Sequence, residues 1–426
     1  MASVELEVDG GGEGSKTKEM SEIRMREKSS NYNNNNNNTK KKNKKKDKNG
    51  SYRNYIPKLG FGCLRTEFDK EGNFDMEVVD GAGQRRNPTH LIIMVNGLIG
   101  SAQNWRYAAK QFLKKYPEDV IVHCSECNSA KLTFDGVDVM GERLAEEVIS
   151  VIKRHPGVQK ISFVGHSLGG LVARYAIAKL YGRDVTRESA QENGECRSDG
   201  SGDPCREEKF RGKIAGLEPM NFITSATPHL GSRGHKQVPV FCGLYTMEKA
   251  ASRTSHFLGR SGKHLFLTDK DDGKPPLLLQ MANDCEDLKF ISALQSFKRR
   301  VAYANVRFDH LVGWSTSSLR RRDELPKLRR LSRDDKYRHI VNVEIAETSS
   351  CQQEVPLEAK VNGCKNIDLE EEMIRGLTKM SWERIDVNFS RTKQRLFAHS
   401  TIQVKTYCIN SAGADVVQHM IDRFLL

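Results

Sequence analysis

The stretch Gln159 to Tyr181, QKISFVGHSLGGLVARYAIAKLY, decides the fold of this chain. It opens with the apolar run Ile161 to Val164, which is typical of a buried strand, and closes with apolar residues at helical spacing. Between these two patterns stands the hexapeptide Gly165-His166-Ser167-Leu168-Gly169-Gly170. The pattern therefore predicts a strand, a sharp turn and a helix, in that order.

A serine in such a turn can be a nucleophile. Its hydroxyl needs a base to take the proton and a backbone that lifts it clear of its neighbours. In a G-x-S-x-G elbow, crowding leaves room only for glycine two residues on either side of the serine. The N–H of Leu168, at the start of the following helix, would point at the oxyanion that forms on the substrate. The same short pattern also occurs in connections without catalysis, and the flanking strand and helix are what favour catalysis here.

Composition and cysteine usage limit the class of protein. With 426 residues and 48.1 kDa, the chain can hold one large α/β domain with insertions, or two ordinary domains. Its ten cysteines are spread along the sequence, which predicts reduced thiols rather than a disulfide framework. Cys124 and Cys127 follow His123 but lack the second pair of ligands that a zinc site needs. We expect no metal and no cofactor.

Neither end of the sequence shows a recognisable targeting or lipidation signal. The first twenty residues are acidic and have no apolar core, and the last residues, FLL, are not a prenylation box. The longest strongly apolar run is Leu91 to Val95, far too short to span a bilayer. We therefore expect a cytoplasmic protein that is not secreted and has no transmembrane segment, and whose contact with membranes or lipid droplets is peripheral.

Two basic segments account for most of the net charge of +13. Residues 1–50 hold 12 Lys or Arg and 8 Asp or Glu, and residues 298–338 hold 13 and 5. The block Lys40 to Lys48 is consistent with a nuclear signal, a tether to anionic surfaces or a solvated tail. No aromatic residues are interleaved with it, which argues against nucleic-acid binding. Residues 298–338 could lie on anionic phospholipid, or could equally be a solvated charged loop.

The domain organisation follows from composition. Residues 1–52 are low in complexity, with an Asn run and the lysine block, and we expect them to be disordered. Residues 53–426 are expected to form the catalytic domain, with polar insertions near 183–212 and 350–367. Helical fragments within 235–297 could form a cap over the site.

From Pro88 onward, strand and helix patterns alternate, which predicts a mostly parallel central sheet flanked by helices. The expected strands are His90 to Val95, Val120 to His123, Ile161 to Val164, Met220 to Ser225, Arg300 to Val306, Ile340 to Ile345 and Trp382 to Phe389. The expected helices are Asn104 to Lys115, Met140 to Arg154, the one that follows Ser167, Asp368 to Lys379 and Gly413 to Leu426.

Three residues fit a catalytic triad. Catalytic groups of open parallel sheets gather at the carboxyl ends of strands, and hydrolases of this type carry them in the order Ser, Asp, His. Ser167, Asp309 and His399 satisfy both conditions. Asp309 would orient the imidazole of His399, which would move the proton. The N–H of Leu98, in the turn Asn96-Gly97-Leu98-Ile99-Gly100, would be the second oxyanion donor.

Other histidines and aspartates fit the triad less well. His310 is a neighbour of Asp309, and His419 lies within the last predicted helix. The remaining rivals come too early in the chain or lie in the presumed cap: His229, His339, Asp271, Asp272 and Asp284.

From about Lys58 onward the chain resembles the plant and fungal family of "putative serine esterases", lipase-like members of the α/β-hydrolase superfamily. The residues that carry the resemblance are the Asn96 to Gly100 turn with Trp105, Thr133 to Val137, Met140 to Leu144, Gly165 to Gly170, Thr227 to Gly231, Tyr303 to Val306 before Asp309, and Ala398, His399 and Ile402. The resemblance implies an α/β-hydrolase fold and hydrolysis of lipid acyl esters by Ser167, Asp309 and His399. Many lipases have His-Gly where this chain has Asn96-Gly97.

The sequence therefore predicts a serine hydrolase that cleaves carboxylic esters, with lipid acyl esters as the expected substrate and a role in lipid metabolism. The alternative is a catalytically idle α/β-hydrolase that serves as a binding or scaffold module. The presence of all three triad residues argues against that alternative.

Overall fold

The chain divides into two units, Met1–Pro57 and Lys58–Leu426. This computed structural model describes residues 64–68, 74–78, 87–183, 210–232, 258–269, 273–332, 334–346 and 366–426. The first unit, and with it the tail predicted at 1–52, lies outside the described residues. So do nearly all of the insertions predicted at 183–212 and 350–367.

The described strands form one nine-stranded sheet in the order β1-β2-β4-β3-β5-β6-β7-β9-β8. The neighbours from β4 to β9 run parallel, whereas β1 and β2 at one edge and β8 at the other are antiparallel to their neighbours. The strands are β1 (Leu64–Phe68), β2 (Phe74–Val78), β3 (His90–Val95), β4 (Val120–Cys124), β5 (Lys160–His166), β6 (Glu218–Ser225), β7 (Arg299–Asn305), β8 (Ile340–Ala346) and β9 (Trp382–Val387).

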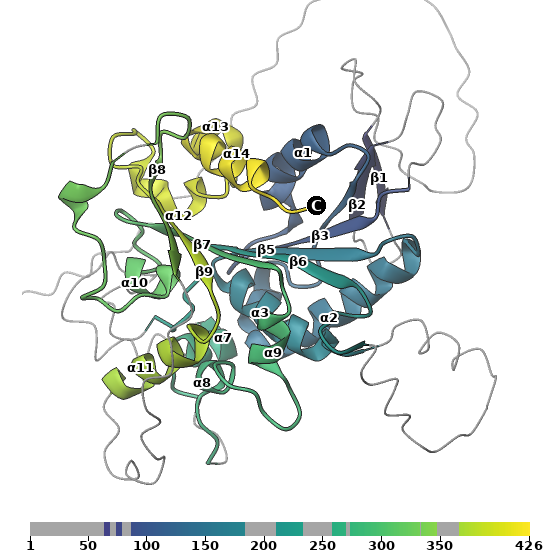
Figure 1. Cartoon of the computed structure of the whole chain (residues 1–426), viewed down its shortest axis with the longest axis horizontal. Coiled ribbons are helices and arrows are strands. Elements are labelled where there is room, and N and C mark those ends of the chain that lie inside the picture. The colour runs from purple at the N-terminus through teal and green to yellow at the C-terminus, as the bar shows by residue number, and fades with distance from the viewer. Residues whose placement is uncertain are drawn as a thin grey trace, which may run out of the picture. The chain divides into compact units, whose positions relative to one another are not determined.

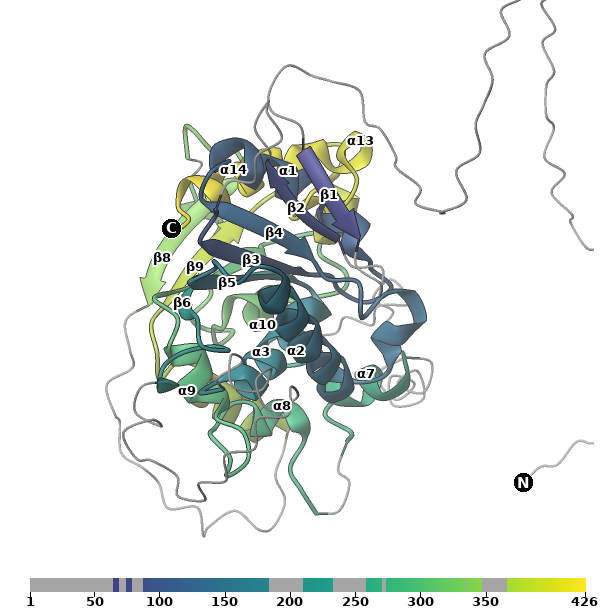
Figure 2. The same ribbon diagram turned by 90° about the vertical axis from the view of Figure 1, so that its right-hand side faces the viewer.

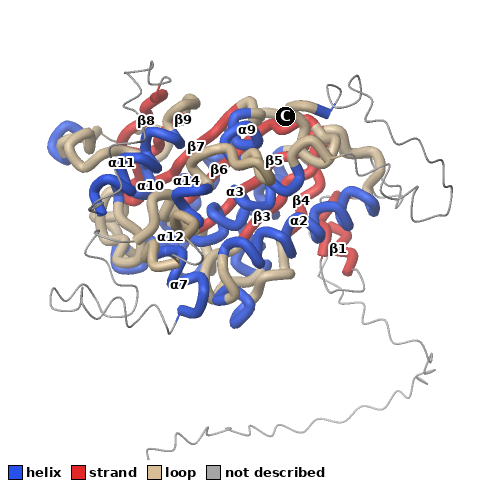
Figure 3. Tube along the Cα trace, turned by 90° about the horizontal axis from the view of Figure 1, so that it is seen from below, coloured by secondary structure: helices blue, strands red, loops and turns tan. Residues whose placement is uncertain are grey.

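Helices cover both faces of this sheet (Figures 1 and 2). One face carries α1 (Arg106–Lys115) and α14 (Ala414–Asp422), and the other carries α2 (Val137–Arg154), α3 (Leu168–Leu180) and α9 (Phe290–Gln295). Figure 3 shows α2, α3 and α9 lying across the strands when the sheet is seen from below. The predicted fold class, a mostly parallel sheet between helices, is confirmed.

Burial on both faces explains why β3 carries the unbroken apolar run Leu91 to Val95. In β3, Leu91 and Ile93 join the core on the α2 and α3 side, while Ile92 and Met94 join the core on the α1 and α14 side. Successive side chains of a strand point to opposite faces, so a strand covered on both sides needs an unbroken apolar run.

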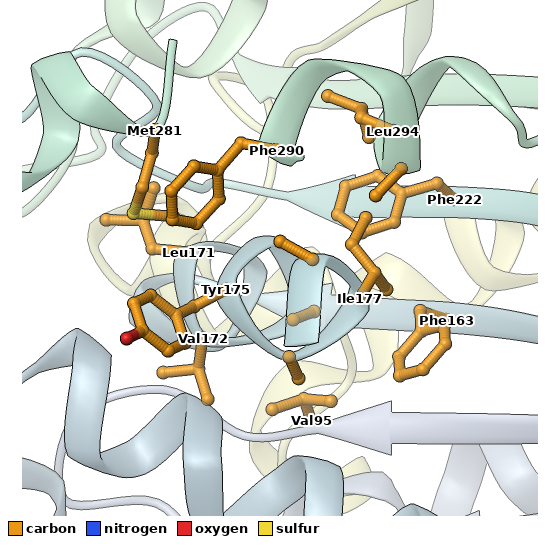
Figure 4. Close-up of a cluster of buried hydrophobic side chains, with 14 of the residues drawn as sticks. Val95, Phe163, Leu171, Val172, Tyr175, Ile177, Phe222, Met281, Phe290 and Leu294 are labelled. Carbon is orange, nitrogen blue, oxygen red and sulfur yellow. The ribbon is translucent and has the colours of Figure 1, made fainter. Parts of the chain in front are cut away.

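Helix α3 is enclosed by its neighbours, which explains its apolar residues on nearly every side (Figure 4). Tyr175 packs against Phe290 of α9 with ring centroids 5.7 Å apart. On the same side of the sheet, Phe222 of β6 contacts Phe297 with ring centroids 5.6 Å apart. This packing fixes the helix that begins directly after Ser167.

The remaining described α-helices all follow β6 in the chain. They are α7 (Gly259–Leu265), α8 (Leu277–Gln280), α10 (Trp314–Ser318), α11 (Asn366–Leu377), α12 (Ala398–Thr401) and α13 (Tyr407–Asn410). The helical fragments predicted within 235–297 are present as α7, α8 and α9. Arg174 of α3 donates to the carbonyl of Met281 at 2.9 Å, which joins α3 to the residue after α8. Residues 235–257 and 270–272 of the predicted cap lie outside the described residues.

Two features differ from the sequence prediction. The sheet begins before Pro88, because β1 and β2 form an antiparallel pair whose alternating apolar and charged residues gave no long apolar run. The last helix ends at Asp422 rather than Leu426. Among the described residues, no helix has the length and apolar composition required to cross a membrane.

Candidate active site

Ser167 occupies a strained turn between β5 and α3. Its φ of 55° and ψ of −129° are rarely adopted by a residue with a side chain. The strain is held in place by a hydrogen bond from the Ser167 N–H to the carbonyl of Ser225 at 2.9 Å. Ser225 is the last residue of β6, so two neighbouring strands fix the conformation of the turn.

The glycines of the motif are required by close packing. A Cβ on Gly165 would lie 2.6 Å from the Cα of Gly170, and a Cβ on Gly169 would lie 2.4 Å from the carbonyl oxygen of Val95. Both distances are shorter than a side chain can tolerate. The tight turn and the approach of α3 to the end of β3 therefore depend on these two glycines.

Asp309 and His399 are brought together from positions 90 residues apart in the chain. The Nδ1 atom of His399 lies 3.0 and 3.1 Å from the two carboxylate oxygens of Asp309. Because a carboxylate accepts, Nδ1 carries the proton and Nε2 is left with the free lone pair of a base. His399 reaches this position from α12, after the end of β9, and Asp309 follows the end of β7.

The carboxylate of Asp309 is held by several donors besides His399. The Asn305 Nδ2 donates to it at 2.8 Å, and the backbone N–H groups of Leu311 and Val312 donate at 3.0 and 2.9 Å. Burial by itself raises the pKa of Asp309, but His399 and these hydrogen bonds outweigh it, so the pKa lies below its ordinary value. Asp309 is therefore an ionised, fixed partner for the imidazole.

His166 links the elbow to the histidine loop. Its Nε2 donates to the backbone carbonyl of His399 at 2.7 Å, and the two imidazole rings are 4.7 Å apart. Burial, and then the proximity of His399, lower the pKa of His166 to about 3. A neutral ring whose Nε2 carries the proton fits this bond, because a carbonyl oxygen can only accept.

The turn after β3 lies directly against the candidate nucleophile. A Cβ placed on Gly97 would be 2.7 Å from the Cβ of Ser167 and 3.3 Å from its Oγ. The Gly97 carbonyl accepts from Gly100 N at 2.9 Å and from Asn96 Nδ2 at 3.2 Å. The two hydrogen bonds orient the Gly97–Leu98 peptide plane, and a trans peptide directs its N–H away from its carbonyl.

Two backbone N–H groups are available near Ser167. Neither the N–H of Leu98 nor that of Leu168 donates a hydrogen bond to another residue of the described chain. Leu168 is the first residue of α3, where helix geometry leaves the N–H without an intrahelical partner. These are the two donors that the sequence predicts for an oxyanion hole.

The hydroxyl of Ser167 forms no hydrogen bond with any described residue, His399 included. Catalytic hydrogen bonds are often long in unliganded enzymes and shorten when substrate binds. Ser167 is nevertheless the sequence neighbour of His166, which contacts the backbone of His399. The sequence-predicted residues thus gather at the carboxyl edge of the sheet.

The rival residues occupy other environments. His310 is exposed, and the Tyr303 hydroxyl lies 2.9 Å from Nδ1 of buried His419. Asp284 accepts from the N–H groups of Ile291 and Ser292 and so caps the start of α9. His229 is buried beneath the turn after β6, whereas Asp271 and Asp272 lie outside the described residues.

The sequence identifies the triad candidates but not the residues that orient them. Asn305, His166 and Asn96 each hold a neighbouring group of the site. His166 and Asn96 stand beside motif residues, which is the one signal in the sequence that could have pointed to them. Their roles depend on contacts between distant segments.

The side chains of Cys124 and Cys127 pack on different sides of the sheet. Cys124 is buried in the core on the α1 side, whereas Cys127 packs against the core on the α2 side. Burial, and then the neighbouring Glu147, raise the pKa of Cys127. Within the described ranges, no group of three His, Cys, Asp or Glu residues is arranged to hold a metal ion.

The sheet order and the strand-to-helix elbow define the α/β-hydrolase class. Residues 85–319 match the family described as "Putative serine esterase (DUF676)", and the chain belongs to this family. The match supports a lipase-like hydrolase. It covers the elbow, both predicted oxyanion residues and Asp309, and it ends before His399.

Fungal proteins are similar to this chain over about half of its length. The "Putative lipase ROG1" of Saccharomyces cerevisiae is 30% identical over 265 residues, covering 59% of this chain and 32% of that protein. The "Putative lipase C4A8.10" of Schizosaccharomyces pombe is 26% identical over 241 residues, covering 54% of this chain and 26% of that protein. The chain thus spans about a third or less of these relatives. They confirm the fungal half of the resemblance, and the plant half stays a prediction.

Solved structures also resemble the chain, at low identity. The mature form of Bacillus licheniformis lipase BlEst2 is 14% identical, with a TM-score of 0.30, and the match covers 55% of this chain and 71% of that one. A "putative aryl esterase" from Burkholderia cenocepacia is 14% identical, with a TM-score of 0.29, and covers 60% and 84%.

Proposed function

We propose that this chain is a serine hydrolase that cleaves carboxylic esters, and lipid acyl esters in particular, through Ser167, His399 and Asp309. The observation that carries the proposal is the His399 and Asp309 contact at 3.0 Å, at the same sheet edge as a serine in a strained strand-to-helix turn. Strain of this kind is maintained where function uses it.

The proposed reaction has two steps. The Ser167 oxygen attacks the ester carbonyl while His399 Nε2 takes the hydroxyl proton, and Asp309 stabilises the imidazolium. The oxyanion accepts hydrogen bonds from the N–H groups of Leu98 and Leu168, each worth about 10² to 10³ in rate. His399 then returns the proton to the departing alcohol, which leaves an acyl-enzyme. In the second step His399 deprotonates water, the hydroxide attacks the acyl-enzyme, and Ser167 leaves with the proton as the acid departs.

The proposed lipid substrate and cytosolic setting have separate support. The curated relatives are named lipases, and exposed apolar side chains flank His399 at Leu396 and Phe397. Cys127, Cys285 and Cys408 are free thiols, which fits a reducing compartment. Peripheral contact with a membrane or lipid droplet belongs to the same proposal.

A fluorophosphonate probe and a series of esters of increasing acyl length test the proposal. The full chain should label, and turnover should rise toward long acyl chains. Ser167→Ala should lose labelling and about 10⁶-fold in kcat. Ser400→Ala is the matched control, because its side chain is half-buried next to His399 and is assigned no catalytic role. All three proteins must show the same thermal transition.

The outcomes separate the parts of the proposal. An intact, folded protein that never labels would reject the hydrolase and favour the idle binding module. Labelling with turnover greatest for acetate esters would keep the esterase and reject the lipid substrate.

A further inference from the structure

The loop between β9 and α14 carries His399 and is basic between Arg391 and Lys405. From Val387 to Ala414 it contains four cations and not one Asp or Glu. The cations are Arg391, Lys393, Arg395 and Lys405. Because the loop follows the carboxyl end of β9, it lies at the sheet edge that holds the candidate active site.

These cations have no acidic partners in the described part of the chain. Arg395 instead lies over the ring of Phe308, 5.3 Å from its centroid. Three of the cations converge on one open surface hollow of about 450 Å³. The residues that line it are Ser390, Arg391, Thr392, Lys393, Arg395 and Leu396. No described acidic side chain therefore neutralises the positive charge gathered at this hollow.

The basic segment at 298–338 differs in this respect. Arg299 pairs with Glu383, and Arg320 pairs with Asp386 and Glu344. Further pairs join Lys298 to Glu218, Arg321 to Glu324 and Glu371, and Lys336 to Asp422. Several positive charges of this segment, which the sequence allowed either on an anionic surface or in a solvated loop, are thus paired within the fold.

The same loop exposes large apolar side chains. Leu396 is 62% exposed and Phe397 57%, directly before buried Ala398. Tyr407 and Ile409 of α13 are 55% and 53% exposed, and Tyr407 stacks on Tyr107 of α1 with centroids 5.0 Å apart. Figure 1 shows α13 beside α14, in the yellow C-terminal part of the chain. Exposed apolar side chains in the same loop as these cations are typical of an interaction surface.

We propose that these residues form a basic–apolar rim that docks the protein onto an anionic phospholipid surface. The rim consists of Arg391, Lys393, Arg395, Leu396, Phe397, Lys405, Tyr407 and Ile409. Cations attract the protein to anionic headgroups, and Leu396 and Phe397 enter the boundary between headgroups and acyl chains. An anionic membrane interface binds cations that lie among exposed aromatic and aliphatic side chains. The cations of the rim have no acidic partner among the described residues.

Docking of the rim would set the candidate active site against the lipid. Phe397 is two residues from His399, so the loop that enters the surface also carries the proposed base. In this respect the inference rests on the proposed function. Vesicle binding can nevertheless be measured without any catalysis.

Co-sedimentation of the full chain with phosphatidylcholine vesicles, with and without phosphatidylserine, tests the inference. The variant R391Q/K393Q/R395Q should bind anionic vesicles roughly 30- to 100-fold more weakly. The variant L396S/F397S should lose about tenfold. The matched control is K327Q/L328S/R329Q, which removes two exposed cations and an exposed leucine from the 298–338 segment. It should bind within about twofold of the unaltered chain. Each variant must keep the thermal transition of the unaltered protein.

Several results would overturn the rim. One is equal binding by all variants, which would place the contact in the lysine block Lys40 to Lys48 or elsewhere. Another is a loss confined to the control, and a third is full competition by glycerol phosphate, which would indicate a site for free phosphate. Retention of RNA with the same dependence on the rim would point to a different partner. A protein that binds vesicles through the rim but never labels with fluorophosphonate would sustain the rim and reject the hydrolase.

Discussion

Gly97 marks the closest approach between the turn after β3 and Ser167. The turn has no room for a methyl group, since a Cβ there would lie 2.9 Å from the carbonyl oxygen of His166 as well as 2.7 Å from the Cβ of Ser167. The next residue but one, Ile99, has a φ of 53°, a strained value for a β-branched side chain. Closeness and strain in one turn indicate that it is shaped for a task beyond connecting β3 to α1.

Gly97→Ala should therefore reduce the proposed esterase activity far more than it reduces stability. The methyl group would push the turn away from Ser167 and move the Leu98 N–H off the oxyanion. A displacement of about 1 Å costs on the order of 10²-fold in rate, and we expect that loss in kcat with little change in KM. Steady-state kinetics on a soluble short-chain ester measures both constants.

Gly157→Ala provides the matched control, because a Cβ there meets nothing within 4 Å and the site is exposed. It should leave kcat unchanged. Unaltered kinetics in Gly97→Ala would show that the turn does not contribute to catalysis. That result would also reject the assignment of the Leu98 N–H as an oxyanion donor.

At the level of single residues, the sequence predicts the triad candidates better than the residues that hold them in position. Ser167 is recognisable because its flanking strand and helix are local patterns. Asp309 and His399 are predicted from chain order, and their catalytic roles stay predictions although the two side chains are in contact. Asn305 could not be predicted to hold Asp309, because an isolated Asn before a loop has many possible partners.

Among the elements, the antiparallel edge strand β8 depends on a buried network of charged residues. Arg320, fully buried, donates to Asp386 of β9 at 2.8 Å and to Glu344 of β8 at 2.8 Å. Trp314 of α10 and Asn342 of β8 donate to the same Asp386 carboxylate at 2.7 and 2.9 Å. A single carboxylate thus joins α10, β8 and β9.

Arg320→Met should destabilise the protein by about 3 to 5 kcal/mol, since it leaves Asp386 buried without its cation. Adding Asp386→Asn should recover part of the loss, because the second change removes the uncompensated charge. Equilibrium urea unfolding of the single and double variants measures both effects.

The neighbouring Arg321 offers a matched comparison. It pairs with Glu324 and Glu371 near the surface, where its side chain is 38% exposed. Arg321→Met should cost at most about 1 kcal/mol, because solvent screens such pairs. Similar losses for the two arginines would contradict the argument that burial makes the Arg320 network decisive for β8.

The sequence also predicts the central elements better than the edges. The strands β3, β4 and β5 are predicted close to their bounds, because burial on both faces demands apolar runs. The strands β1 and β2 alternate apolar with charged residues over five positions each, too short and too polar for recognition. The orientation of β8 could not be predicted, because the segment before it has no helical pattern that would show how the chain returns.

For the whole molecule, several of the described histidines are buried and neutral. His90 lies at the start of β3 with its Nε2 2.8 Å from the Ser162 hydroxyl and its ring 5.1 Å from that of Phe424. Burial, and then the positive charge of Lys160, lower the pKa of His90 to about 3. Burial likewise lowers the pKa of His419 to about 4. The folded protein therefore leaves these histidines unprotonated at pH values at which the unfolded chain would protonate them.

Stability should fall as the pH drops below about 6.5, the pKa of an unfolded histidine. Between that pH and the folded pKa of about 3, the unfolded state binds a proton at His90 and the folded state does not, so acid favours unfolding. Each such histidine costs about 2 kcal/mol on going from pH 6.5 to pH 5.

Urea unfolding at pH 7, 6 and 5 should show this decline in stability, and His90→Gln should reduce the slope of the decline by about the share of one histidine. His310→Gln, at an exposed position, should leave the slope unchanged. A stability that stays constant from pH 7 to pH 5 would mean that these histidines are protonated in the folded state without unfolding it. The buried histidines would then not determine how the stability of the fold declines in acid.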